Sequence, residues 1–277
     1  MTQNKETIKT KIWYEESEAD NPYAAKACYC SGYDVYGDLL GKVSWVQYLY
    51  LLFRLELPGR QQARLLETVA VALANPGIRD LSVRTAMNAG VGGSTRASAL
   101  MAALAVGAGN LGGGREVYLC VALWQSLGSD LEKWRQAIAE PAAEERIDVW
   151  LPMEHVPGFD PNGVSCPAPV LQVLEALAEI SPENGVLQWL RSQRIALESA
   201  TGYPLAFSGV AAAAFHDLGF SPEQAEMLYL MLRLPGAAAH ALEQEGNNWR
   251  QYPFFGSSLK PLSNDEYQDV LQSLENS

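Results

Sequence analysis

The side chains with the clearest chemical potential lie in one apolar stretch, Arg233-Leu-Pro-Gly-Ala-Ala-Ala-His240-Ala-Leu-Glu243-Gln. His240 and Glu243 would share one face of a helix, either as a ligand pair or as a packed pair in which a neighbouring group hydrogen-bonds the imidazole. The packed pair is the commoner arrangement. The planar guanidinium of Arg233 suits two-point binding of a carboxylate, although a surface charge would look the same in the sequence.

Further reactive side chains lie in the stretch 150–169, which contains His155, Asp160 and Cys166. Its five prolines exclude a regular helix, and irregular loops often carry function. A cysteine nucleophile paired with a histidine would fit these residue types, but one residue of each type in such a stretch also arises by chance. His216 has a simpler explanation, because it lies at the end of a predicted helix, where its ring interacts favourably with the helix dipole.

The glycine-rich break at 107–116 could cradle a phosphate, since Arg115 would lie at a helix start. It lacks the Gly-Lys-Ser/Thr ending of a P-loop, and a predicted helix rather than a strand precedes it. A tight turn between packed helices is the preferred interpretation.

Helices must position these side chains, because apolar residues recur at helical spacing along most of the chain. No alternating pattern is long enough to predict a strand, so the expected fold class is all-α. Residues 1–24 are expected to form a polar, extended or loosely attached segment. A large helical lobe at 25–150 and 236–277 and a small lobe at 151–235 would follow. The expected helices cover about 45–53, 61–74, 84–108 (as more than one helix), 117–123, 131–139, 169–180, 184–199, 209–218, 222–233, 236–245 and 264–275.

The composition narrows the classes of partner. A formal net charge of −12 and the absence of a run of Lys and Arg argue against nucleic acid and anionic membranes. The spacing of the cysteines and the scarcity of histidines do not fit zinc ligation, so no metal is expected. The N-terminus lacks the apolar core of a signal peptide, and no apolar run approaches the roughly 20 residues of a membrane span. We therefore expect a cytoplasmic protein with reduced thiols.

Six segments between about residues 31 and 256 form an ordered set. They are Ser31-Gly-Tyr-Asp34 with Asp38-Leu-Leu-Gly-Lys-Val-Ser-Trp45, Tyr50-Leu-Leu-Phe-Arg-Leu-Glu-Leu-Pro58, Gly112-Gly-Gly-Arg-Glu116, Val156-Pro-Gly-Phe159, Leu218-Gly-Phe220, and Arg233 to Gln244. Together they resemble the citrate synthase and citryl-CoA lyase family in its short form. The last segment is the most specific, since it is similar to the family's Arg-x-x-Gly-x-x-Ala-His-x-x-Glu-Gln.

The resemblance implies a multi-helix fold with a large and a small lobe, and chemistry at the α-carbon of a CoA thioester. In the family an aspartate removes the α-proton, while two histidines stabilise the enolate and polarise the acceptor carbonyl. The aspartate falls here on Ser208, and the enolate histidine falls on Leu111. The acceptor histidine falls on Pro161 or, with a one-residue shift, on Asp160, and an upstream substrate histidine falls on Pro76. Leucine and proline exchange no protons and a lone serine is a weak base, so the standard reaction is not expected.

The ligand-binding positions that the resemblance implies are better preserved. Arg233, Arg84 and His240 are the candidate substrate-binding residues, and Glu116 is retained. The family counterpart of one loop lines the CoA adenine, and its residues here are Val156, Pro157, Gly158 and Phe159. The implied ligand is a CoA thioester or a polycarboxylate, with no covalently bound cofactor. Since the family assembles as dimers with shared sites, the implied partner is a second copy or a paralogous subunit.

Three functions are consistent with these residues. The first is a non-catalytic relative that binds an acyl-CoA or polycarboxylate, or pairs with an active subunit. The second is an enzyme with altered chemistry on a CoA thioester, either a carbon–carbon lyase or synthase or an acyltransferase acting through Ser208 or Cys166. The third is a structural helical protein with a closed cleft. We favour the first, because four functional positions are lost together while the core-defining segments persist.

Overall fold

The computed structural model of the protein describes residues 10–140, 153, 155–247, 249–254, 268 and 272. The described chain is mainly helical, which confirms the predicted fold class. The predicted helix at 264–275 lies outside the described residues except at 268 and 272. The α-helices are α1 (Trp45–Arg54), α2 (Arg60–Leu73), α3 (Leu81–Val91), α4 (Arg96–Gly107), α5 (Gly114–Leu127), α6 (Leu131–Ala139), α7 (Ala168–Ile180), α8 (Val186–Thr201), α9 (Phe207–Asp217) and α10 (Pro222–Glu245).

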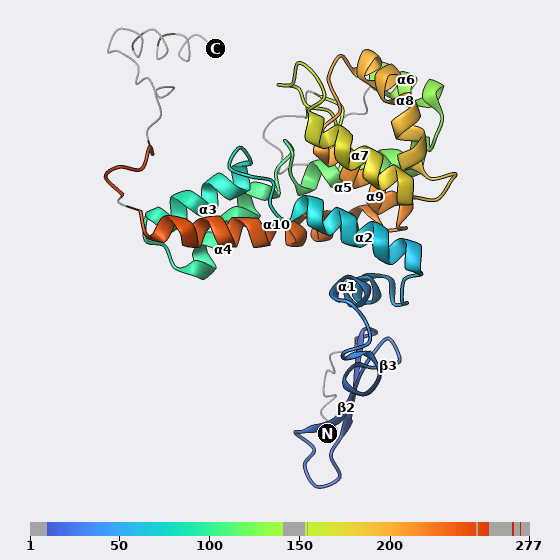
Figure 1. Ribbon diagram of the computed structural model, residues 1–277, viewed down its shortest axis with the longest axis vertical. Coiled ribbons are helices and arrows are strands. Elements are labelled where there is room, and N and C mark those ends of the chain that lie inside the picture. The colour runs from blue at the N-terminus through green and yellow to red at the C-terminus, as the bar shows by residue number, and fades with distance from the viewer. Residues whose placement is uncertain are drawn as a thin grey trace.

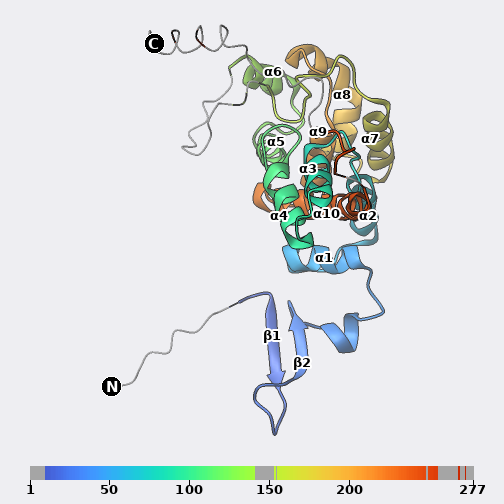
Figure 2. The same ribbon diagram turned by 90° about the vertical axis from the view of Figure 1, so that its left-hand side faces the viewer.

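A small antiparallel sheet precedes the helices and projects from them (Figures 1 and 2). Its strands are β1 (Trp13–Ser17), β2 (Ala25–Cys30) and β3 (Tyr33–Asp34), and the π-helix η1 (Val35–Leu39) follows. The expectation that the chain contains no strand was therefore wrong. β1 is largely exposed, so it lacks the apolar alternation that marks a half-buried strand. Ser31 and Gly32 both have positive φ, as a two-residue hairpin turn requires.

The main core surrounds α9, which contacts α2, α5, α7, α8 and α10. All residues from Ser208 to Phe215 are buried. Gly209 and the four alanines at 211–214 have little or no side chain, so the neighbouring helices can approach the α9 backbone closely. The sequence at the start of α9 thus places the Ser208 hydroxyl inside the protein.

A second, smaller core lies where α10 packs against α3 and α4, which also pack against each other (Figure 1). Small residues permit this close packing: a Cβ atom on Gly90 would lie 2.2 Å from the carbonyl oxygen of Ala241. The long α10 therefore contributes to both cores (Figure 1). No helix in the described part of the chain is long and apolar enough to span a membrane.

The continuity of α10 corrects a second expectation. Two helices were expected, with a break at Pro235, but one helix runs from Pro222 to Glu245 with this proline inside it. Proline interrupts the helical ladder because it has no N–H group. The next N–H, of Gly236, donates to the carbonyl oxygen of Ala74 at 2.7 Å. This contact with the end of α2 supplies a partner outside the helix, so the chain remains helical through the interruption.

Candidate functional site

The carboxylate of Glu116 is the centre of a buried polar cluster. Glu116 lies in the first turn of α5, directly after the glycine-rich break, and is only 1% exposed. One carboxylate oxygen, Oε2, accepts the N–H of Gly112. The other, Oε1, accepts the N–H of Gly158 at 2.8 Å and the hydroxyl of Ser208 at 3.0 Å. Glu116 therefore joins the glycine turn, the 155–160 loop and the start of α9.

His155 approaches the same carboxylate from the proline-rich loop. Its Nε2 atom lies 3.7 Å from Oε1 of Glu116, and its side chain is 7% exposed. This nitrogen is buried and has no hydrogen-bond partner among the described residues. His155 thus approaches Glu116 without forming a close hydrogen bond.

The peptide of Gly112 is held from its other side by α10. Its carbonyl oxygen accepts the hydroxyl of Tyr229 at 3.0 Å and Nη1 of Arg233 at 3.2 Å. Gly112 has a φ of +64°, a conformation that glycine adopts without strain. Burial raises the pKa of Tyr229 to about 12, so its phenol keeps the proton that it donates to Gly112.

Arg233 is buried and engaged from three directions. It is 5% exposed, and its Nη2 atom pairs with the carboxylate of Asp80. Its guanidinium carbon lies 4.7 Å from the ring centroid of Tyr229, within the range of a cation–π contact. The third contact is the one with Gly112. Asp80 is the N-cap of α3, and its other carboxylate oxygen accepts the N–H groups of Ser82 and Val83.

The two predicted catalytic residues have different environments. The structure brings Ser208 together with Glu116 and His155, which lies 3.7 Å from the same carboxylate oxygen. Asp160 instead stabilises its own loop: its carboxylate accepts the N–H of Asn162 at 2.9 Å, and its N–H donates to the carbonyl of Pro204. The catalytic role of either residue stays a prediction.

The predicted cofactor-binding loop packs into the protein at its second half. Gly158 and Phe159 are buried, whereas Val156 and Pro157 remain partly exposed. Gly158 has a φ of +91°, and a Cβ atom there would lie 2.8 Å from the Cα of Gly209. Phe159 forms an isolated antiparallel bridge with Leu205. The sequence Pro-Gly-Phe is thus explained by close packing against α9, and its contact with a CoA adenine stays a prediction.

The other two predicted substrate-binding residues, Arg84 and His240, have no hydrogen bond or ion pair with Glu116 in the described part of the chain. Arg84 is exposed on α3. His240 is held on both sides: Nδ1 lies 3.3 Å from a carboxylate oxygen of Glu243, and Nε2 lies 3.2 Å from the side-chain oxygen of Asn75. The geometry of His240 corresponds to the packed pair, and its role in binding a substrate stays a prediction.

The cysteines near the site are poor nucleophiles. Cys120 is buried beside Gly158, and burial together with the charge of Glu116 raises its pKa well above the usual range. Burial and then Glu198 raise the pKa of the half-buried Cys166 thiol. A raised pKa lowers the fraction of thiolate, which is the nucleophilic form. Among the described residues there is no group of three or more His, Cys, Asp or Glu that could hold a metal ion.

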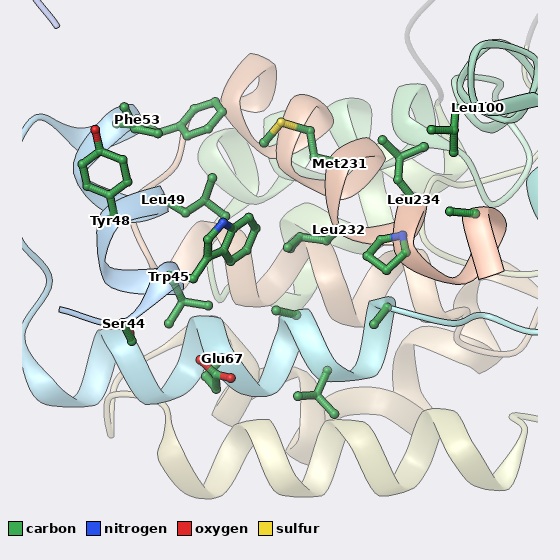
Figure 3. A pocket seen from close by; sticks show the side chains of 17 residues that line it. Ser44, Trp45, Tyr48, Leu49, Phe53, Glu67, Leu100, Met231, Leu232 and Leu234 are labelled. Atoms are coloured by element: carbon green, nitrogen blue, oxygen red, sulfur yellow. The ribbon is translucent and has the colours of Figure 1, made fainter. Parts of the chain in front are cut away.

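A separate apolar groove of about 880 Å³ lies between α1, α2, α4 and α10 (Figure 3). Trp45, Leu49, Met231 and Leu232 are among its lining residues. None of the predicted site residues lines this groove. It is therefore distinct from the Glu116 cluster.

The polar cluster can hold charge but offers little access to a substrate. Glu116 could accept the Ser208 proton across their 3.0 Å hydrogen bond. However, both residues are 1% exposed, so no solvent-facing atom of either group reaches a reactant in this conformation. The cluster as it stands connects helices and loops.

Sequence reasoning missed two members of this network, Asp80 and Tyr229. An acidic residue before an apolar helical pattern is a helix-start signal, so the sequence did contain a signal for Asp80 as an N-cap. Its pairing with Arg233 joins residues 153 positions apart. No local pattern reveals such a contact.

Protein-family models and curated protein sequences give no match to this chain. Several solved structures, however, are similar to it. Citryl-CoA lyase from Hydrogenobacter thermophilus is 18% identical with a TM-score of 0.63, and the match covers 94% of this chain and 99% of that chain. ATP citrate lyase from Methanothrix soehngenii, in complex with citrate and coenzyme A, is 17% identical with a TM-score of 0.70, covering 95% of this chain and 43% of that chain.

Citrate synthase from Thermoplasma acidophilum is similar over a shorter part, with 14% identity and a TM-score of 0.56, covering 80% of this chain and 58% of that chain. These likenesses establish that the chain has a citrate-synthase-like multi-helix fold. The chain spans less than half the length of the ATP citrate lyase.

Proposed function

We propose that this protein is a relative of the citrate synthase and citryl-CoA lyase family that does not perform the family's standard reaction. Its role is to bind an acyl-CoA or a polycarboxylate, or to pair with an active subunit. The fold supports the relationship. The ATP citrate lyase neighbour binds citrate and coenzyme A, and the citrate synthase neighbour binds carboxymethyl coenzyme A and oxaloacetate. A CoA thioester is thus a chemically reasonable ligand for the same fold.

The observation that carries the proposal is the environment of Ser208. By resemblance this serine stands at the position of the base that removes the α-proton. Its hydroxyl is buried and donates to Glu116. A base must reach the proton that it removes, directly or through one water. The nearby carboxylate does not replace it, because Glu116 is itself only 1% exposed and reaches no ligand proton in this conformation.

A direct test is to incubate the pure protein with acetyl-CoA and oxaloacetate, and separately with citryl-CoA, and to measure the release of free CoA with a thiol reagent. We expect release no faster than in buffer, beside an active citrate synthase as the positive control. Release of free CoA at enzyme-like rates would contradict the proposal. Calorimetry with CoA and acetyl-CoA tests the binding role, and the absence of any binding would instead favour a structural protein with a closed cleft.

One observation favours a second function, acyl transfer from a CoA thioester through Ser208. The hydroxyl lies 3.0 Å from a carboxylate that could take its proton. The acyl group would move from sulfur to the serine oxygen, and the thiolate would leave with a proton. Mass spectrometry after incubation with acetyl-CoA would detect an added acetyl group on Ser208, and its absence at saturating thioester would exclude this function.

A further inference from the structure

Arg233 is a buried cation whose binding capacity is largely filled by the protein itself. Nη2 pairs with Asp80, Nη1 donates to the carbonyl of Gly112, and the ring of Tyr229 lies against the guanidinium. The side chain of Arg233 is 6% exposed. A guanidinium binds a ligand carboxylate best with two parallel N–H groups. Here Nη2 already pairs with Asp80 and Nη1 is bound to Gly112, while the buried Nε has no hydrogen-bond partner among the described residues.

Asp80 is fixed in place by the helix that it caps. Its Oδ1 atom accepts the N–H groups of Ser82 and Val83 at the start of α3, and the hydroxyl of Ser82 also donates to it. A negative charge at a helix N-terminus is further stabilised by the helix dipole. Displacing Asp80 from Arg233 would therefore disturb the cap as well as the ion pair.

The space around Arg233 is too small for a second carboxylate. The cavity that Arg233 lines together with Ser82 and Leu230 has a volume of about 10 Å³, which is at most the room for one water. A ligand carboxylate beside Arg233 would also lie close to the negative charge of Asp80, and like charges repel strongly in a site of low polarity.

We infer that Asp80 is a specificity-determining residue: it acts as a built-in carboxylate for Arg233 and excludes ligands that would bind there through a carboxylate of their own. The inference rests on the proposed binding function and narrows its ligand class. The acceptable ligand is a CoA thioester held by other contacts, not a citrate-like di- or tricarboxylate anchored on Arg233. Removing the Asp80 carboxylate should create a small-carboxylate site.

The test uses Asp80→Ser, because serine keeps a good N-cap oxygen while it removes the charge and opens space. Thermal unfolding is followed in formate, acetate, oxaloacetate or chloride at equal ionic strength. We expect formate and acetate to raise the melting temperature of the serine variant saturably, by about 2–4 °C. The unsubstituted protein should show no rise beyond that in chloride, and calorimetry should detect no binding of citrate or oxaloacetate.

Two control variants isolate the cause. Asp80→Asn removes the charge but fills the same space, so its melting temperature should not respond specifically to formate. The double variant Asp80→Ser with Arg233→Met has the space without the cation, and it should not respond either. If Asp80→Ser does not fold, Asp80→Gly takes its place in the formate test, because glycine also removes the charge, opens the same space and is an acceptable N-cap residue.

Two outcomes would overturn the inference. One is citrate or oxaloacetate binding to the unsubstituted protein that Arg233→Met abolishes. The other is a serine variant that folds but responds to formate no more than to chloride. Neither outcome involves CoA release, so a failure here is distinguishable from turnover in the CoA-release assay, which would contradict the proposed function itself.

Discussion

Two buried charges of opposite sign, on Glu116 and Arg233, bind opposite sides of one glycine peptide. Glu116 accepts the N–H of Gly112, while Arg233 donates to its carbonyl oxygen. A buried ion is stable only when it is paired and hydrogen-bonded. Asp80 pairs with the arginine, and two backbone N–H groups and a hydroxyl satisfy the glutamate. Substituting Glu116 or Arg233 should therefore lower the free energy of unfolding, whatever its effect on ligand binding.

The first prediction concerns Glu116→Gln. One carboxamide nitrogen would have to face a backbone N–H, either of Gly112 or of Gly158, which leaves a buried donor unsatisfied. We expect a loss of about 2–3 kcal/mol in the free energy of unfolding, measured by urea denaturation. Glu132→Gln is the matched control, because the Glu132 side chain is 78% exposed and should change stability by less than about 0.5 kcal/mol. Equal effects in both variants would contradict the structural role of Glu116.

At the level of single residues, the sequence indicated which residues belong to the site better than it indicated which residues they contact. The glycine turn, Ser208 and Arg233 were all singled out, and the structure connects all three through Glu116 and Gly112. The partner of Arg233 was not predicted, because Asp80 belongs to a distant segment and its local pattern indicates only a helix start. Which groups meet across the fold depends on tertiary packing, and short motifs do not contain that information.

Among the elements, α10 depends on a single contact at its proline. The N–H of Gly236 donates to the carbonyl of Ala74, and a Cβ atom at 236 would lie only 2.6 Å from that oxygen. Because the obstacle is backbone, it cannot rotate away as a flexible side chain could. The close approach of α10 to the end of α2 therefore requires glycine at this position.

The second prediction follows from this contact. Gly236→Ala should destabilise the protein by about 1–3 kcal/mol, because the two helices must separate to admit the methyl group. Gly246→Ala is the matched control: it lies at the end of the same helix with a φ of −80°, and no atom lies within 4 Å of its added Cβ. Its stability should be unchanged or slightly raised. A neutral Gly236→Ala would mean that the helices do not meet as described.

Helices were predictable wherever the apolar periodicity was strong, and α2, α6 and α7 begin and end close to the expected residues. Two features of the fold were not predictable in this way. The strands β1 to β3 lack alternation because most of their side chains are exposed or only half-buried. The join at Pro235 was interpreted from local sequence alone, whereas the compensating partner is Ala74, on a distant segment. Local sequence patterns indicate burial and helix propensity. They do not show a hydrogen bond from a distant segment that stabilises an unfavourable residue.

For the whole molecule, the projecting sheet and the adjoining apolar groove are the surfaces that a partner could cover (Figures 2 and 3). Tyr14 is exposed on the sheet, Tyr36 on the π-helix and Leu40 directly after it. Trp45 is 64% exposed in the groove. Large apolar side chains exposed together commonly mark an interface. The expected pairing with a second copy or a paralogue stays a prediction.

The third prediction is that the protein forms a dimer of identical chains in the absence of a paralogue. Light scattering after size-exclusion chromatography should give twice the mass of one chain. Trp45→Glu should shift the equilibrium towards single chains by placing a charge in the groove, while Ile195→Glu, at an exposed residue of α8 outside both the sheet and the groove, should not. A single-chain mass at high concentration for the unsubstituted protein would contradict the pairing.

The doubly held peptide of Gly112 has a kinetic consequence. Its N–H donates to Glu116 of α5, and its carbonyl oxygen accepts from Tyr229 and Arg233 of α10. The plane of this peptide therefore cannot rotate without breaking both sets of hydrogen bonds. Deuterium can replace the amide hydrogen only when this region opens. The exchange rate at this one amide therefore reports how often the bond between Gly112 and Glu116 opens to solvent.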